Sequence, residues 1–144
     1  MDAGTRQVSA MRAGAVAGAL ALVAAPGAWA CGEALRGTTD RIENARYEIV
    51  FAAVPAPIEA GKHFSLDIAV CPRGGAEPPS AVRVDAVMPE HRHGMNYRPV
   101  VVARGANSYR ADGLMFHMPG RWDVLFDIVT STGTLRLTAT KQLE

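Results

Sequence analysis

Three segments of the chain alternate between apolar and polar residues, and this two-residue period restricts the fold more than any other feature of the sequence. They are His63–Val70 (HFSLDIAV), Ala81–Met88 (AVRVDAVM) and Arg121–Thr130 (RWDVLFDIVT). Successive side chains of a β-strand point to opposite faces of a sheet. Each segment therefore predicts a strand with one buried face and one face in water.

Four other segments are rich in β-branched and aromatic residues, and turns that contain Gly or Pro separate the predicted strands. No stretch after residue 30 keeps a helical period. The four segments are Ala45–Val54, Arg98–Gly105, Ser108–Phe116 and Thr134–Gln142. About seven short antiparallel strands in roughly a hundred residues predict an all-β, immunoglobulin-like sandwich.

The first thirty residues have the organisation of a secretory signal peptide. Two arginines precede the apolar run AGAVAGALALVAAPGAWA, which ends in an A-x-A cleavage signature at Ala28–Ala30. The run is too short and too rich in Ala and Gly for a membrane-spanning helix. A start at Met11 leaves an equally complete signal. We predict a signal peptide over residues 1–30, one domain over residues 31–144 without a transmembrane segment, and a periplasmic or secreted location.

The charge balance argues against two classes of partner. The whole chain has a formal net charge of +1. The predicted signal peptide accounts for this excess, because it contains two arginines and one aspartate. The remaining domain is formally neutral, which indicates neither nucleic acid nor an anionic membrane surface as a partner.

Two cysteines, Cys31 and Cys71, remain after the predicted cleavage. In an exported protein an even count favours a disulfide, which here ties the N-terminus to the end of the strand His63–Val70. The alternative is a lipoprotein that is acylated on Cys31. Such signals usually have a leucine-like residue three positions before the cysteine and a small residue two before it, where this chain has Ala28 and Trp29. We therefore favour the disulfide.

Histidine and methionine are concentrated in two short segments. After residue 30 the chain has four of each, and all but His63 fall in MPEHRHGM (Met88 to Met95) and MFHM (Met115 to Met118). Imidazole nitrogen and thioether sulfur together favour copper over hard cations. The two segments therefore predict a copper site, for Cu(I), Cu(II) or both.

The strand pattern separates candidate ligands from core residues. Met88 is in phase with the buried positions of its strand, so we assign it to the core. His91, His93 and Met95 follow Pro89 in a predicted loop, where Gly94 lets the chain fold back and brings Met95 toward the same point.

In the second segment, the alternation of GLMFHM buries Phe116 and turns His117 outward together with Met115. Met118 precedes the Pro119-Gly120 turn and can leave the alternation. His63 stands alone at the start of a strand, and we assign it to the surface. The predicted metal ligands are His91, His93, Met95, His117 and Met118, with Met115 as the alternative to Met118.

Other site chemistries lack their sequence signatures, and we expect no enzymatic activity. The sequence contains no G-x-S-x-G, no H-E-x-x-H and no phosphate-binding glycine loop. A blue-copper centre needs a thiolate closely followed by His and Met, whereas PRGGAEPP follows Cys71. A structural zinc site needs four closely spaced Cys or His ligands, and thioethers suit zinc poorly.

The segments PIEAGKHFSLDIAV, DAVMPEHRHGMNYRPVV and YRADGLMFHMPGRWDVLFDI resemble the FixH/YtkA-like domain, an exported immunoglobulin-like β-sandwich. The shared features include a strand that ends in MP, a loop with HGM, a hairpin at GANSY, and MPG before an aromatic strand. The resemblance implies a periplasmic or surface domain associated with copper handling and respiratory oxidase assembly. It carries ligand roles onto His93, Met95, His117 and Met118. The chain departs from FixH itself in having a cleavable signal instead of a retained membrane anchor.

Two functions are consistent with these observations. The first is a periplasmic copper chaperone or buffer, because a surface site lets ligands be exchanged one at a time during transfer. The second is a protein-interaction module without a metal, which supports assembly of a membrane or respiratory complex. Its HRHGMNY loop would dock on a partner, with the methionines as adaptable apolar contacts. Copper titration separates the two.

Overall fold

The computed structural model describes residues 1, 4 and 30–144 of the chain. The predicted signal peptide falls almost entirely on residues outside this part. Within it, no helix is long and apolar enough to cross a membrane. Residues 30–144 form nine strands: β1 (Thr39–Glu43), β2 (Tyr47–Val54), β3 (His63–Pro72), β4 (Ala81–Met88), β5 (His93–Gly94), β6 (Val100–Gly105), β7 (Ser108–Met115), β8 (Gly120–Thr130) and β9 (Gly133–Leu143).

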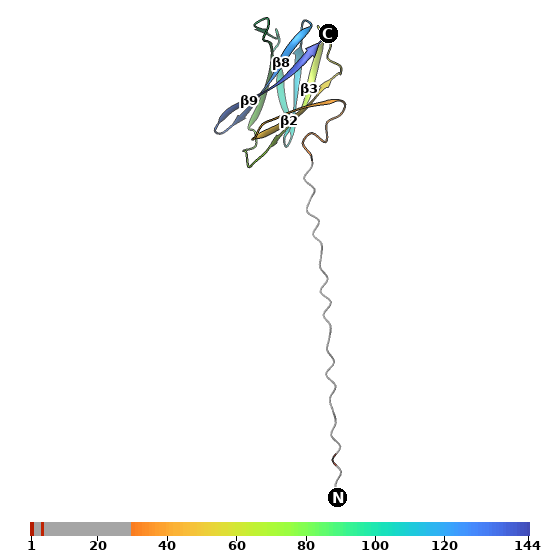
Figure 1. The fold of residues 1–144 in the computed structure, drawn as a ribbon, viewed down its shortest axis with the longest axis vertical. Coiled ribbons are helices and arrows are strands. Elements are labelled where there is room, and N and C mark those ends of the chain that lie inside the picture. Colours follow the sequence, from red (N-terminus) through yellow and green to blue (C-terminus); the bar gives the residue numbers. More distant parts are fainter. Residues whose placement is uncertain (2–3, 5–29) are drawn as a thin grey trace.

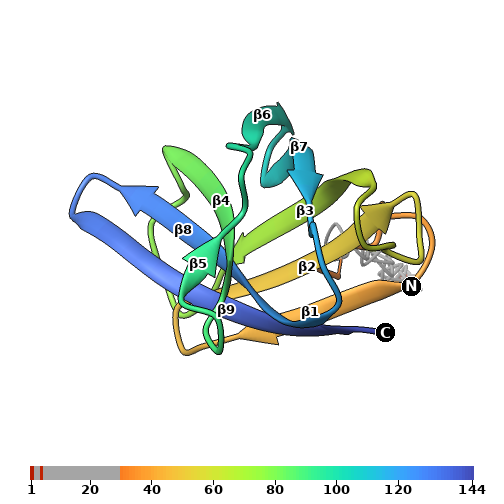
Figure 2. The ribbon, with the colours of Figure 1, turned by 90° about the horizontal axis from the view of Figure 1, so that it is seen from above.

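The strands form two antiparallel sheets, packed as a sandwich (Figure 1). The five-stranded sheet has the order β1-β2-β3-β7-β6, and the four-stranded sheet has the order β5-β4-β8-β9. Seen from above, β1 and β9 run beside each other at one edge (Figure 2). There the Lys141 ammonium of β9 pairs with the Asp40 carboxylate of β1. The predicted all-β sandwich is confirmed.

Each of the seven predicted strands corresponds to an observed strand, with ends that differ by a few residues. The structure adds two strands. The sequence TDRIE of β1 has charged residues at three of five positions, as expected for a strand at a sheet edge, so it lacks the apolar alternation that predicts a strand. The strand β5 contains only His93 and Gly94, which the sequence analysis assigned to a loop.

The core lies between the sheets and is apolar, and no polar or charged side chain of the described residues is buried. Three aromatic rings fill the end of the core where β3 and β8 begin. The rings of Phe64 and Phe116 pack edge to face, with their centroids 4.9 Å apart. Phe116 stacks on Trp122 at 4.7 Å. Of these three rings, Trp122 also lies next to the rings of His93 and His117.

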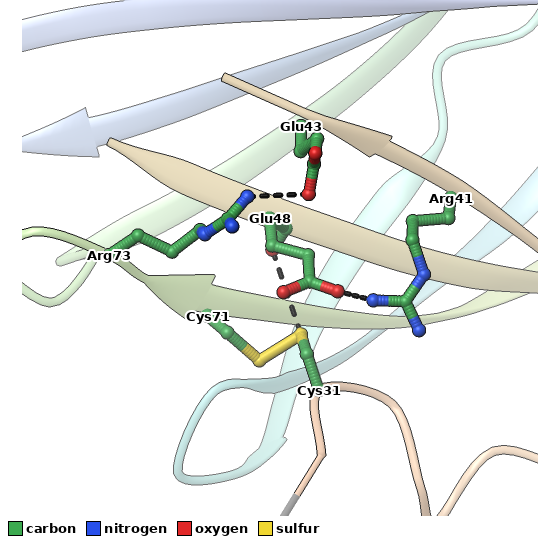
Figure 3. The surroundings of a disulfide bond; sticks show 6 residues. All are labelled: Cys31, Arg41, Glu43, Glu48, Cys71 and Arg73. Carbon is green, nitrogen blue, oxygen red and sulfur yellow. Dashed lines mark hydrogen bonds and ion pairs between the residues drawn. A yellow bond between two sulfur atoms is a disulfide. The ribbon is translucent and has the colours of Figure 1, made fainter. Parts of the chain in front are cut away.

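The opposite end of β3 is joined to the N-terminal segment by a disulfide between Cys31 and Cys71, which confirms the predicted pairing (Figure 3). The two Cα atoms are 5.9 Å apart. The Sγ atom of Cys31 lies 3.7 Å from the carbonyl oxygen of Glu48, whose carboxylate pairs with Arg41. Because Cys71 follows His63 by eight residues along β3, at a rise of about 3.3 Å each, roughly 26 Å separate this bond from His63.

Candidate metal centre

All four histidines of the chain lie at the end of the sandwich that is remote from the disulfide. The strand β3 begins with His63, directly opposite Met115 at the end of β7. The segment after Met115 crosses from one sheet to the other and contains His117. On the second sheet, β5 pairs with the end of β4 and brings in His93, with His91 in the preceding turn. The topology thus gathers residues that lie up to 54 positions apart in the sequence.

The turn between β4 and β5 positions two of the histidines. The backbone N–H of His91 donates to the Met88 carbonyl at 3.2 Å, and that of Arg92 donates to the Pro89 carbonyl at 3.3 Å. Arg92 takes the left-handed conformation, with a φ of 57°. The chain then pairs back on β4, with His93 opposite Met88.

This geometry corrects the role we expected for Gly94. The reversal occurs in the turn that ends at Arg92, and Gly94 is not among the glycines with positive φ. Instead, a Cβ atom at Gly94 would lie 3.2 Å from the carbonyl oxygen of Ala86. That oxygen accepts a hydrogen bond from the N–H of Met95 at 3.1 Å. Gly94 therefore permits the close approach of β5 to β4.

Three imidazole rings form a row with His93 in the middle, which we call the histidine row. The centroid of the His93 ring lies 5.7 Å from that of His91 and 5.0 Å from that of His117. Behind the row is the buried indole of Trp122, which is 6.0 Å from the His93 ring and 5.2 Å from the His117 ring. The sequence analysis did not single out Trp122 as a neighbour of the site, because nothing local to β8 signals the contact.

Hydrogen bonding distinguishes the ring nitrogens. Nδ1 of His93 lies 3.2 Å from the carbonyl oxygen of Gly94. A carbonyl oxygen only accepts hydrogen bonds, so a neutral His93 that makes this bond has its proton on Nδ1 and a free lone pair on Nε2. Nδ1 of His117 is buried and has no hydrogen-bond partner among the described residues. A buried polar atom left without a partner costs about 1 to 3 kcal/mol, which a bound ion would offset.

The methionines occupy different environments. Met88 is 1% exposed and belongs to the core, as predicted. Met95 and Met118 are partly buried and pack against the core. The carbonyl of Met118 accepts a hydrogen bond from Nε1 of Trp122 at 3.0 Å, which holds this segment against β8. Met115 is partly exposed and lies opposite His63 on the neighbouring strand.

The spacing of the three rings is compatible with a shared ion. Two imidazoles that bind one ion through nitrogens at about 2.0 Å have centroids about 5 to 6 Å apart. Within residues 30–144, however, no group of three or more His, Cys, Asp or Glu side chains is already arranged as a metal site. Binding of one ion by all three imidazoles would thus require a rearrangement of their side chains.

Comparison of the chain with models of protein families, with curated proteins and with solved structures finds no match. The resemblance to FixH/YtkA-like domains therefore stays a prediction from short motifs. The candidate site is accordingly argued from the geometry of its residues alone.

Proposed function

We propose that the protein binds copper outside the cytoplasm, at the histidine row, and that it acts as a copper buffer or chaperone. The observation that supports this most is the convergence of His91, His93 and His117 from two segments, with ring centroids 5.0 and 5.7 Å apart. The free lone pair that the Gly94 contact leaves on His93, and the unpartnered Nδ1 of His117, add two nitrogens that an ion can use.

The chemistry of the donors favours copper. Neutral imidazole binds Cu(II) well, and a thioether from Met95 or Met118 as a fourth ligand extends the site to Cu(I). Both methionines pack on the core beside the row, so either can turn toward an ion after a change of rotamer. His91 is exposed and His93 partly exposed, so a partner can replace ligands one at a time.

Copper titration of residues 31–144 without a histidine tag tests this proposal. Trp122 is the single tryptophan of that segment and lies against the row, so a bound Cu(II) ion should quench its fluorescence. We expect one equivalent of Cu(II) to quench the wild type. The double variant His93→Ala, His117→Ala should bind at least about 100-fold more weakly, since loss of a supporting group alone costs up to this much. The matched control, His63→Ala, should bind Cu(II) like the wild type.

The affinity should also depend on pH. Imidazole binds a metal only as the neutral base, so protons compete with copper. We expect the Cu(II) affinity to fall as the pH is lowered, because added protons occupy the ring nitrogens that would bind the ion. An affinity that is constant between pH 5 and 8 would contradict binding through imidazole.

One observation favours the second candidate, an interaction module without a metal. Large apolar side chains are exposed directly after the loop: Tyr97 is 44%, Val100 65% and Val102 45% exposed. The two valines lie on β6, which is an edge strand. If the wild type and the His93→Ala, His117→Ala variant bind copper equally, the copper proposal is wrong and this surface becomes the basis for function.

A further inference from the structure

We propose that His63 and Met115 form a second copper position, selective for Cu(I), beside the histidine row. Its biological meaning depends on the proposed copper function, but its binding can be tested separately. The sequence analysis placed His63 on the surface as a lone residue. Only the strand pairing shows that it has a soft ligand as its neighbour.

The register of the five-stranded sheet places the two side chains together. His63 of β3 and Met115 of β7 are directly opposite each other, and the adjacent pair is Phe64 and Leu114. Phe64 is 4% exposed and Leu114 is fully buried, so both point into the core. Neighbouring residues on a strand point to opposite faces, so His63 and Met115 share the outer face. Directly opposed residues have Cβ atoms about 4.5 to 5.5 Å apart, which allows one ion to contact both side chains.

The environment of Met115 differs from that of the other methionines. Met88 lies within the core, and Met95 and Met118 pack against it. Met115 instead belongs to the partly exposed face beside His63. The thioether of Met115 is thus a sulfur donor on the outer face of the sheet, beside the imidazole of His63.

Tyr97 links this pair to the first site. Its ring meets the His63 ring edge to face, with centroids 4.8 Å apart and planes at 72°. Tyr97 follows Met95 by two residues, so the loop that leaves β5 reaches across to the start of β3. His117 likewise follows Met115 by two residues. Both chain segments therefore connect the pair of His63 and Met115 with the histidine row.

The two positions have different donor chemistry. One imidazole and one thioether form a small, soft ligand set, which suits Cu(I). Cu(II) prefers several nitrogen or oxygen donors in tetragonal geometry, and the histidine row has more of them. We therefore assign only Cu(I) to His63 and Met115, whereas the histidine row can hold either Cu(II) or Cu(I). Tyr97 acts as a positioning residue, because it restricts the rotation of the His63 ring.

The test is an anaerobic Cu(I) titration against a competing chelator, combined with a separate Cu(II) titration, on residues 31–144. We expect the wild type to bind two equivalents of Cu(I). The variant His63→Ala, Met115→Leu should lose one Cu(I) equivalent and keep its Cu(II) affinity. The variant His93→Ala, His117→Ala should lose Cu(II) binding and keep one Cu(I) equivalent. Leucine is close to methionine in volume, and His63 is exposed, so the first variant should keep its fold.

A spectroscopic readout identifies the ligand directly. With 13C-labelled methionine methyl groups, we expect the Met115 signal, assigned from the Met115→Leu spectrum, to shift when the first equivalents of Cu(I) are added. An unshifted Met115 signal, together with equal Cu(I) stoichiometry in wild type and His63→Ala, Met115→Leu, would overturn the second position. If the histidine row binds no Cu(II) but His63 and Met115 still bind Cu(I), the proposed function of the row is wrong and the second position stands.

Discussion

Met88 is a methionine that we expect to stabilise the core and not to bind copper. Its side chain is 1% exposed, and its Cε atom lies 2.8 Å from where a Cβ atom of Gly120 would be. Met88 therefore fills the space between the end of β4 and the start of β8, and it lies opposite His93 in the strand register. A larger residue at Gly120 would displace it.

We expect Met88→Ala to lower the free energy of unfolding by about 2 to 5 kcal/mol, because it removes buried apolar contacts and leaves a cavity. Urea unfolding measures the change. The Cu(II) affinity of the folded variant should stay near that of the wild type. Met115→Leu is the control, and it should change stability by less than about 1.5 kcal/mol. A loss of copper binding in a stable Met88→Ala protein would instead place Met88 among the ligands.

The hairpin of β8 and β9 is joined on its outer face by an ion pair. Asp127 and Arg136 are directly opposite in the register. The guanidinium donates from Nε to Oδ1 at 2.6 Å and from Nη2 to Oδ2 at 2.8 Å. These hydrogen bonds, aided by the positive charges of Arg136 and Arg83, hold the pKa of the Asp127 carboxyl below its usual value.

A lowered pKa in the folded state means that the pair stabilises the fold at neutral pH. That stabilisation is lost as the pH falls below the ordinary range of Asp, about 3.9, toward the lower folded pKa. We expect Asp127→Asn to reduce stability by about 0.5 to 1 kcal/mol at pH 7, since the pair is partly exposed. The difference from wild type should shrink below pH 4. Unfolding curves at pH 7 and pH 3 test this, and a difference that is the same at both would contradict it.

Across the whole molecule, the disulfide and the candidate copper site occupy opposite ends of β3. The bond closes a segment with a sequence separation of 40 residues. A crosslink over a loop of this length contributes about 3 to 4 kcal/mol, by restricting the unfolded chain. Because roughly 26 Å of strand separates Cys71 from His63, copper affinity should not depend on the bond.

We therefore expect the double variant Cys31→Ser, Cys71→Ser to unfold at lower urea concentration and to bind copper like the wild type while folded. Both measurements are made on the same preparation. An unchanged unfolding midpoint would show that the bond does not stabilise the domain. A folded variant that binds no copper would show that the two ends of the sandwich are coupled.

The sequence predicted the sandwich from short-range patterns. The alternation in β3, β4 and β8 depends only on adjacent residues, and it correctly predicted which faces are buried. The strands β1 and β5 were missed for opposite reasons. The edge strand β1 has too many charged residues to show a buried face, and β5 is a strand only because its backbone pairs with β4.

The sequence alone also determined which residue types are available as ligands, and it grouped His91 with His93 and Met115 with His117 and Met118. Only the tertiary structure decided that His93 and His117 are neighbours, that Trp122 lies behind them, and that His63 faces Met115. These contacts join residues far apart in the chain. Their register depends on how whole strands pair, and the residues in contact carry no local signal of it.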